Sequence, residues 1–304
     1  MSNETTENVF LDDFDFENDY EDIDKEIRHI EKYTDKGIVA FRQSKFDESL
    51  KYFFKVLEID PTNMEALLRC GECYNYLDDP EEARNYFKKA LKLNKHNVRA
   101  QIGEADALNV LGKYKKALKK IDKVLKKDPE NILALETKAF SLNGLGKYGE
   151  SIEYYDKVLE QQPIHFNAMF GKSADLRSLD RYDECIEYLD KIIELKPDNE
   201  LALISKADTL MECKRYEESL RLYDAMLESS DNPLILIGKC RCLRDMGQYE
   251  EALEYIDKAL DKTDDDPKVI VEKVKVLDKL GREDEVEDYL DKIDDYIDEI
   301  NFED

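Results

Sequence analysis

The sequence has little of what bends a chain sharply. Its 304 residues include only 11 glycines and 7 prolines, and tryptophan is absent. Sheet-rich folds need many tight turns, which glycine and proline supply, so their scarcity argues against such folds and favours helices. Wholesale disorder is excluded as well, because 42% of the residues are hydrophobic and 18 tyrosines and 12 phenylalanines are enough to help bury a core.

The sequence also lacks the marks of export and membrane insertion. No apolar run approaches the roughly 20 residues that span a bilayer. The N-terminus has neither the basic nor the apolar region of a signal peptide. We therefore expect a cytoplasmic protein. Six cysteines in an unexported chain of this length do not indicate a disulfide framework.

Negative charge is present in excess, and it is concentrated at the two ends. The net charge is −26; residues 1–29 contribute −9 and residues 283–304 contribute −11. The remainder is nearly balanced, with 49 acidic and 43 basic residues. Acidic ends repel phosphates and anionic lipids, so we expect neither nucleic acid nor a membrane as partner.

The sequence repeats itself with a period of 34 residues, which is typical of helix-turn-helix arrays. Eight copies cover residues 30–63, 64–97, 98–131, 132–165, 166–199, 200–232, 233–266 and 267–300. They are flanked by an acidic, aromatic-containing tail at residues 1–29, mostly disordered, whose end can extend the first helix. Residues 301–304 form a short C-terminal tail. The last copy, which is acidic on its second helix, is predicted to cap the array.

Two positions of the repeat are small, which lets helices approach closely. Position eight reads Gly37, Gly71, Ala105, Ala139, Ser173, Ala207, Cys240 and Val274. Position twenty reads Ser49, Ala83, Ala117, Ser151, Cys185, Ser219, Ala252 and Val286. Large apolar residues lie between them at spacings of three, four and seven, so each copy is predicted to be a pair of helices.

This pattern resembles the tetratricopeptide repeat family. Besides the small positions, it has an aromatic at position seventeen in most copies and a proline at position thirty-two in Pro61, Pro129, Pro163 and Pro197. The resemblance implies an all-α fold, a right-handed α-solenoid or superhelix of about eight helix-turn-helix units. It also implies a non-catalytic scaffold that binds an unidentified protein or peptide on the concave face made by the first helices.

The family's groove positions, carried over to this sequence, give a predicted binding site. The site consists of Leu68, Ile102, Phe140, Phe170, Arg177, Ile204, Ile237, Arg241, Arg244, Lys268 and Lys275. The alternative interpretation of the apolar members is that they complete packing between neighbouring first helices. The residues that clamp a chaperone's terminal carboxylate in some family members are missing, so we expect no partner of that type.

The charges at two other positions predict ion pairs between consecutive repeats. Position seven is lysine in most copies, and position twenty-five of the preceding copy is then aspartate, as in Asp122 with Lys138. The first two junctions would pair Phe54 with Cys70 and Lys88 with Glu104. We therefore predict a ladder of pairs from each second helix to the next first helix, against the alternative that both rows are solvated and recur by duplication.

Motifs for chemistry are weak. The run Gly144–Gly149 matches a dinucleotide-binding pattern but follows a helix rather than a strand. Cys70 and Cys73 form C-x-x-C inside a predicted helix with no second pair at zinc-like spacing. We therefore predict no catalytic residues, no metal and no cofactor. A thiol or metal-dependent enzyme and a helical-repeat nucleic-acid binder remain the alternatives.

The N-terminal tail carries a further prediction. Within residues 1–21, aromatic and aliphatic residues alternate with acids, a pattern of segments that fold on binding. In the simpler interpretation the tail is a solubilising arm. In the other it docks in the groove, with its carboxylates near the late arginines, and competes with an incoming peptide.

Overall fold

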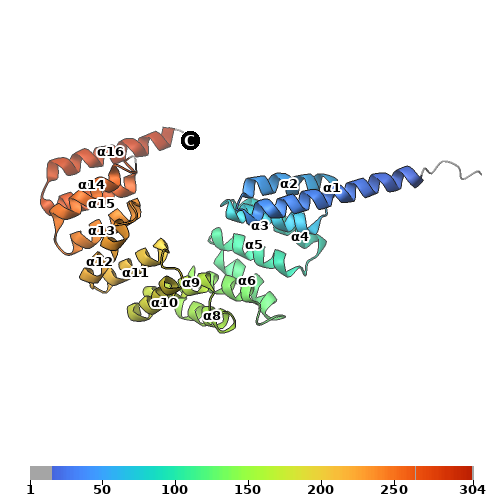
Figure 1. Ribbon diagram of the computed structural model, residues 1–304, viewed down its shortest axis with the longest axis horizontal. Helices are drawn as coiled ribbons and strands as arrows, with labels where there is room; N and C mark the ends of the chain where they lie inside the picture. The colour runs from blue at the N-terminus through green and yellow to red at the C-terminus, as the bar shows by residue number, and fades with distance from the viewer. Residues whose placement is uncertain (1–15, 264, 303–304) are drawn as a thin grey trace, which may run out of the picture. The chain divides into compact units, whose positions relative to one another are not determined.

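The computed structural model describes residues 16–263 and 265–302, and over these residues the protein is entirely α-helical apart from its turns (Figure 1). The all-α fold predicted from the sequence is confirmed. The chain divides into two compact parts, residues 1–146 and 147–304, which we call the N-terminal half and the C-terminal half. Each half is a run of helix pairs that pack in sequence order, which is the packing of an α-solenoid.

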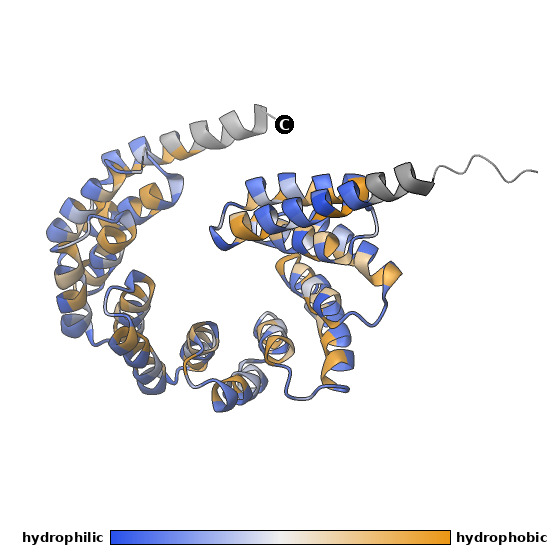
Figure 2. Ribbon diagram, turned by 45° about the vertical axis from the view of Figure 1, so that its right-hand side comes forward, coloured by the Kyte–Doolittle hydropathy of each residue, from blue (hydrophilic) through white to orange (hydrophobic). Residues whose placement is uncertain are grey.

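The helices of the two halves alternate between first and second members of each repeat. The N-terminal half contains α1 (Phe16–Arg42), α2 (Phe46–Ile59), α3 (Met64–Tyr76), α4 (Pro80–Leu93), α5 (Val98–Val110), α6 (Tyr114–Leu125) and α7 (Ile132–Asn143). The C-terminal half contains α8 (Tyr148–Gln161), α9 (Phe166–Ser178), α10 (Tyr182–Leu195), α11 (Glu200–Glu212), α12 (Tyr216–Leu227), α13 (Pro233–Asp245), α14 (Tyr249–Leu260), α15 (Pro267–Leu280) and α16 (Glu283–Phe302). Hydrophobic and hydrophilic residues alternate along these helices, as amphipathic packing requires (Figure 2).

The helix ends follow from residues at fixed repeat positions. An asparagine ends most repeats, and its side chain caps the next first helix; the oxygen of Asn97, for example, accepts a hydrogen bond from the backbone N–H of Ala100 at 2.9 Å. The turn inside each pair needs a left-handed residue at position fifteen. Gly112, Gly146, Gly247 and Gly281 have φ between 66° and 82° there, while Ser44, Asp78, Asp180 and Lys214 adopt the same conformation.

The core of each half is built from the small positions and one large residue at position twenty-four. Phe87 is fully buried and lies so close to Gly103 of the next repeat that a Cβ atom there would be 2.3 Å from its ring. Tyr223 and Gly238 form the same pair, with 2.6 Å between the ring and such a Cβ. Position six is glycine after Phe87, Tyr155 and Tyr223, where a Cβ atom would clash with the ring, whereas Phe53 is followed by Arg69 at that position.

The predicted ladder between repeats is confirmed at five junctions. Lysine Nζ atoms lie 2.5–2.6 Å from aspartate oxygens in Lys138–Asp122, Lys206–Asp190, Lys239–Asp224 and Lys273–Asp257, and Lys172 pairs with Asp156 in the same way. At the first junction, Phe54 and Cys70 pack in one apolar cluster, as predicted.

One predicted pair of the ladder is wrong. Glu104 does not pair with Lys88; its carboxylate lies 2.6 Å from Lys120 and 3.8 Å from Arg84. The reason is that position twenty-three of the same repeat also faces position seven. Tyrosine hydroxyls accept hydrogen bonds from the ladder lysines at that place in later repeats, as in Tyr255 with Lys239 at 2.6 Å. In the third repeat position twenty-three is Lys120, which pairs with Glu104 in place of Lys88.

The first helix begins earlier than its repeat. α1 starts at Phe16, so residues 16–29 continue the first helix of repeat one (Figure 1). Residues 1–15, which hold most of the predicted tail, lie outside the described residues.

Candidate functional site

The first-helix face of the C-terminal half carries a strip of apolar side chains. We define the apolar strip as Phe170 on α9, Leu201 and Ile204 on α11, Leu234 and Ile237 on α13, and Val271 on α15. α13 packs against both α11 and α15, so its residues lie at the middle of the strip. Leu201 and Leu234 are 62% and 61% exposed, whereas Phe170, Ile204 and Ile237 are half-buried and pack on the core.

A cluster of cations adjoins the strip on α13 and α15. Arg241, Arg244 and Lys275 converge on the carboxylate of Glu272, with nitrogen–oxygen distances of 3.1, 2.8 and 2.9 Å. Arg244 also pairs with Asp245 at 2.9 Å. We call these residues the Glu272 cluster. Three cations face two carboxylates, so the cluster retains a net positive charge for an acidic ligand.

Glu272 is held ionised at the centre of this cluster. Burial of its side chain raises its pKa, but the hydrogen bond from Lys275 and the charge of Arg241 outweigh burial and keep the pKa below its usual value. Arg241 and Lys275 remain about half exposed, while Arg244 is more buried. The exposed pair can therefore reach a ligand while Glu272 fixes the orientation of their side chains.

The structure brings together only some of the predicted site residues. Arg241, Arg244 and Lys275 converge, and Phe170, Ile204 and Ile237 belong to one strip. Arg177 lies apart, 4.0 Å from Glu212. Lys268 is exposed in the first turn of α15, and its side chain makes no ion pair within the part of the chain that the structure describes.

The predicted residues of the N-terminal half are placed differently. Leu68 and Ile102 are buried in core clusters, so for these two the packing interpretation holds. Phe140 on α7 is 49% exposed. Glu72 of α3 is paired within the protein: Arg99 of α5 lies 2.6 Å from Glu72 and 2.7 Å from Glu65. These two ion pairs join α3 to α5.

A half-buried carboxylate, that of Asp106, lies at the α5–α7 contact. Burial raises the pKa of Asp106 to about 7, although Thr137 donates a hydrogen bond of 2.8 Å to it; the charge of Glu136 raises the pKa further. Next to it, Ser141 donates to the side-chain oxygen of Asn109 at 2.7 Å. This polar seam joins two first helices of the N-terminal half.

Sequence reasoning missed three residues of the site. Leu201 and Leu234 occupy position two, one of the family's groove positions. An apolar residue at this position could have indicated that they belong to the binding surface. Glu272 occupies position six, which in the other repeats holds Asp35, Arg69, Gly103, Thr137, Gly171, Ser205 and Gly238. Nothing in the sequence indicated that three cations would converge on it.

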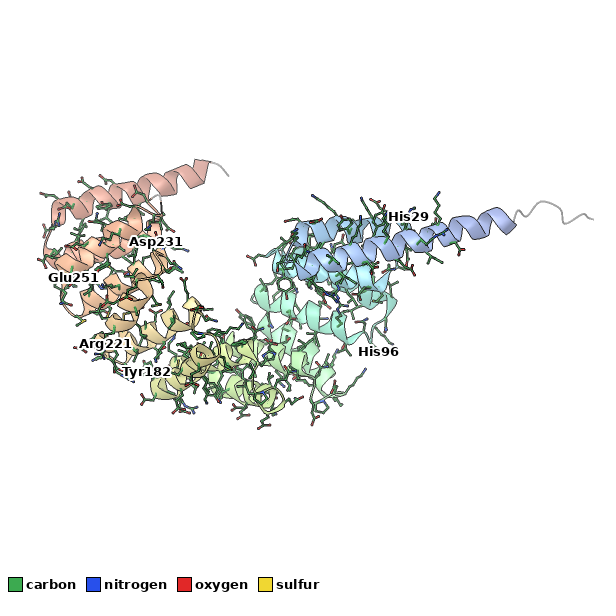
Figure 3. The ribbon with its side chains drawn as sticks, viewed as in Figure 1. His29, His96, Tyr182, Arg221, Asp231 and Glu251 are labelled. Atoms are coloured by element: carbon green, nitrogen blue, oxygen red, sulfur yellow. The ribbon has the colours of Figure 1, made fainter. Side chains whose placement is uncertain are left out.

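No cluster of metal-binding side chains is found in the described residues. The three or more His, Cys, Asp or Glu side chains that a metal ion needs do not come together there. His29 lies on α1 and His96 in the turn after α4 (Figure 3), while His165 caps α9. Within the described residues, no helix is long and apolar enough to cross a bilayer.

The sequence and fold were compared with known proteins. Three family models match parts of the chain: the N-terminal TPR repeats region of Psidin at residues 106–225, a tetratricopeptide repeat at residues 76–132, and the coatomer epsilon subunit at residues 176–302. No curated protein sequence gives a significant match.

Solved structures with the same fold are numerous and distant in sequence. A tetratricopeptide repeat protein of Parabacteroides merdae has 16% identity and a TM-score of 0.62, covering 82% of this chain and 99% of its own. The pilF protein of Pseudomonas aeruginosa has 16% identity and a TM-score of 0.54, covering 66% and 92%. A thermophilic tetratricopeptide repeat protein of Thermus thermophilus has 15% identity and a TM-score of 0.55, covering 60% and 99%. The TM-scores show a shared fold, and at these identities they show the fold alone.

Proposed function

This chain is a tetratricopeptide repeat protein, and from that premise we propose that it is a non-catalytic scaffold whose C-terminal half binds a protein or peptide segment on its first-helix face. The observation that carries the proposal is the apolar strip beside the Glu272 cluster. Leu201 and Leu234 are exposed on α11 and α13, two helices that contact each other, and exposed apolar side chains grouped on one face mark interaction surfaces.

The chemistry of the surface defines its ligand. Leu201, Leu234 and Val271 offer apolar contact for aliphatic or aromatic side chains of the ligand. Arg241 and Lys275 offer donors to a carboxylate, and an Arg–carboxylate pair is directional as well as attractive. The ligand is therefore a segment that combines apolar residues with at least one acidic residue.

The cysteines support a scaffold rather than a thiol enzyme. Burial raises the pKa of the thiols of Cys70, Cys73, Cys185 and Cys242, and it raises that of Cys240 to about 12. A catalytic thiol needs the opposite shift, because the thiolate is the nucleophile. These thiols act as small apolar residues of the core.

The finer part of the proposal concerns the acidic N-terminal tail. Its carboxylates and aromatic residues have the chemistry that the ligand of the C-terminal half requires. We propose that the tail competes with an incoming segment for the Glu272 cluster, in the same or a neighbouring molecule, and so lowers the affinity for the partner. Deleting residues 1–15 would then raise that affinity at low salt and have less effect at high salt, where charge attraction is screened.

The experiment selects ligands from a displayed peptide library with the full-length protein. Selected peptides are expected to combine acidic and apolar residues, and to lose affinity about tenfold or more in Leu234→Asp and Arg241→Glu, as interface anchors do. Leu195→Asp is the matched control, since Leu195 is also exposed but ends α10, a second helix. Peptides whose affinity is the same for all three variants would overturn the proposal.

A further inference from the structure

The second helices of the protein differ in charge in a way that the net charge conceals. α6 carries five lysines and one acidic residue, and α4 carries four bases and two acids. In contrast, α8, α10, α12 and α14 each carry more acids than bases. A chain with a net charge of −26 therefore has one strongly basic surface, and it lies in the N-terminal half.

Most lysines of α6 form no ion pair with the rest of the described chain. Lys120 pairs with Glu104, but Lys115, Lys116, Lys119 and Lys123 are exposed and form no ion pair within the described residues. Lys115, Lys119 and Lys123 follow one another at spacings of four, where like charges on a helix repel and cost stability. α8, α10, α12 and α14 each carry a single basic residue and form the same kind of second helix, so the arrangement on α6 is not required by the solenoid.

α4 extends the same basic surface. Lys113, just before α6, pairs with Glu81 of α4 at 3.1 Å, and Arg84 of α4 and Lys120 of α6 both approach Glu104. The two second helices therefore lie side by side. We define the lysine face as Lys88 and Lys92 on α4 with Lys115, Lys116, Lys119 and Lys123 on α6, all of which are exposed.

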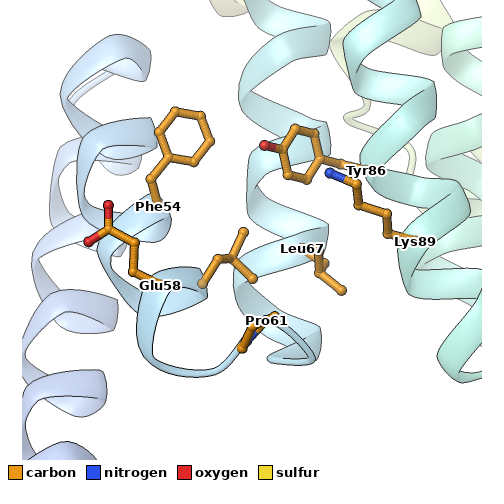
Figure 4. Close-up of a pocket in the computed structure, with 7 residues that line it drawn as sticks. Phe54, Glu58, Pro61, Leu67, Tyr86 and Lys89 are labelled. Carbon is orange, nitrogen blue, oxygen red and sulfur yellow. The ribbon is translucent and has the colours of Figure 1, made fainter.

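An apolar pocket lies at the edge of α4 that faces α2 (Figure 4). Its volume is about 370 Å³, and its walls include Phe54 and Leu57 of α2, Leu67 of α3 and Tyr86 of α4. The rings of Phe54 and Tyr86 are 6.2 Å apart, and Lys89 at the rim holds its ammonium 4.2 Å from the centre of the Tyr86 ring. Phe54 lies at this junction in the repeat position that holds the ladder aspartate in later repeats.

From these observations we infer that the second helices of the N-terminal half form a separate docking surface for an acidic segment of a partner protein, whose aromatic or aliphatic residue enters the pocket. The lysine face supplies charge complementarity along the segment, and the pocket supplies an apolar anchor at its end. The surface lies on α2, α4 and α6, so it shares no residue with the first-helix face of the C-terminal half. The inference does not depend on the proposed function.

The same features argue against a nucleic acid as the occupant. α6 has no arginine, and the arginine of α4, Arg84, approaches Glu81 and Glu104 rather than solvent alone. Arginine is the residue that recognises phosphate with two parallel hydrogen bonds. The two acidic ends of the chain, with −9 and −11, repel a polyanion, and a duplex has no side chain for the pocket.

The test uses the full-length protein carrying Arg241→Glu, which disables the Glu272 cluster as a second site, as the parent for all variants. The probe is a labelled peptide of residues 1–15 of this sequence, because that segment combines acids with phenylalanines. Binding is measured by fluorescence anisotropy at low and high salt. The variant K115E/K119E/K123E removes the charge of the lysine face, and K191E/K258E makes the same kind of change on the exposed surfaces of α10 and α14. A peptide with Phe10 and Phe14 replaced by alanine tests the pocket, and duplex DNA of similar charge tests the other class of ligand.

We expect K115E/K119E/K123E to weaken peptide binding by about tenfold or more, as loss of a charged docking surface does, and K191E/K258E to leave it unchanged. The triple variant should melt close to the parent, because the three side chains are exposed and the glutamates keep the like-charge spacing of the lysines they replace. The alanine peptide should bind more weakly than the parent peptide. Equal affinity of parent and triple variant overturns the inference, as does DNA binding that exceeds peptide binding and is lost in the triple variant.

Discussion

Lys239 of α13 lies 2.5 Å from Asp224 of α12, which joins the second helix of the sixth repeat to the first helix of the seventh. The lysine side chain is only 8% exposed, and its ammonium also donates a hydrogen bond to the hydroxyl of Tyr255 while lying 3.9 Å from the centre of that ring. Lys239 therefore connects three consecutive helices, α12, α13 and α14. The repeats of each half are held in register by charge as well as by packing.

Removing one ladder lysine should destabilise the protein measurably. Lys239→Ala leaves Asp224 solvated and the Tyr255 hydroxyl without its donor, and a hydrogen bond to a charged group contributes about 1.5–3 kcal/mol. We expect a loss of unfolding free energy of about 1–2 kcal/mol in urea melts, because the pair is partly exposed. Lys191→Ala, an exposed lysine outside the ladder, is the control and should change stability by less than about 0.5 kcal/mol.

The ladder also predicts how the unfolding free energy changes at alkaline pH. Although burial lowers the pKa of Lys172, Lys239 and Lys273, their hydrogen bonds to aspartate and tyrosine prevail and raise the folded-state values above 10.5. A raised lysine pKa contributes stability that is present below the unfolded-state value and is lost as pH rises through the folded-state value. The unfolding free energy should therefore fall above about pH 10.5. In the variant lacking Lys172, Lys239 and Lys273 this fall should be smaller, and an unchanged pH profile would contradict the ladder's contribution.

Titration of Asp106 should make the protein more stable at acidic than at neutral pH. Its folded-state pKa is raised to about 7 from 3.8, so the folded protein binds the proton more tightly than the unfolded chain does, and stability should rise as pH falls from 7 toward 4. Asp106→Asn removes the buried charge and keeps an acceptor for Thr137. It should raise stability at pH 8 on the order of 1–3 kcal/mol and flatten the profile between these pH values. A variant with the parent's pH dependence would show that Asp106 titrates normally.

The contact of Phe87 with Gly103 predicts a compensating pair of mutations. Gly103→Ala places a Cβ atom 2.3 Å from the ring and should cost about 1–3 kcal/mol by overpacking. Phe87→Leu should relieve much of that cost, because Leu189 occupies the same position in a repeat that is followed by Ser205. If the two changes add without compensation in a double-mutant cycle, the pairing between position twenty-four and position six is wrong.

The last repeat should be needed for solubility. Val269 and Ile270 of α15 pack on Leu236, Cys240 and Ile256, so truncation before Pro267 exposes an apolar face of the seventh repeat. We expect aggregation or a loss of cooperative unfolding, measured by light scattering and circular dichroism. A soluble truncation with the parent's melting temperature would mean that α15 and α16 do not cap the array.

Much of the fold was predictable because the same local sequence pattern recurs in eight repeats. The small residues at positions eight and twenty, such as Gly37 and Ser49, fixed the helix pairs, and Ser49 indeed donates a hydrogen bond to the carbonyl of Gly37 at 2.9 Å. Complementary charges 15 or 16 residues apart, as in Asp122 with Lys138, identified the ladder. Recurrence made these signals readable without any homologue.

The site was less predictable because exposure depends on neighbours that the repeat pattern does not specify. Leu68 and Ile237 share position five, yet Leu68 is buried while Ile237 stays half-buried at the surface. Glu104 pairs with Lys120 rather than Lys88, because position twenty-three of its repeat is a lysine, Lys120, where most repeats have tyrosine. Such single departures from the repeat change a local contact without changing the fold, and only coordinates show which contact replaces it.

The central claim, that the apolar strip and the Glu272 cluster bind a partner segment, is tested most directly by hydrogen exchange. Amide exchange of the full-length protein is measured with and without a saturating selected peptide. The account predicts slower exchange in α11, α13 and α15 on binding, with little change in α10, α12 and α14 beyond that transmitted to adjacent turns. Protection confined to second helices, or located wholly in residues 16–146, would contradict it.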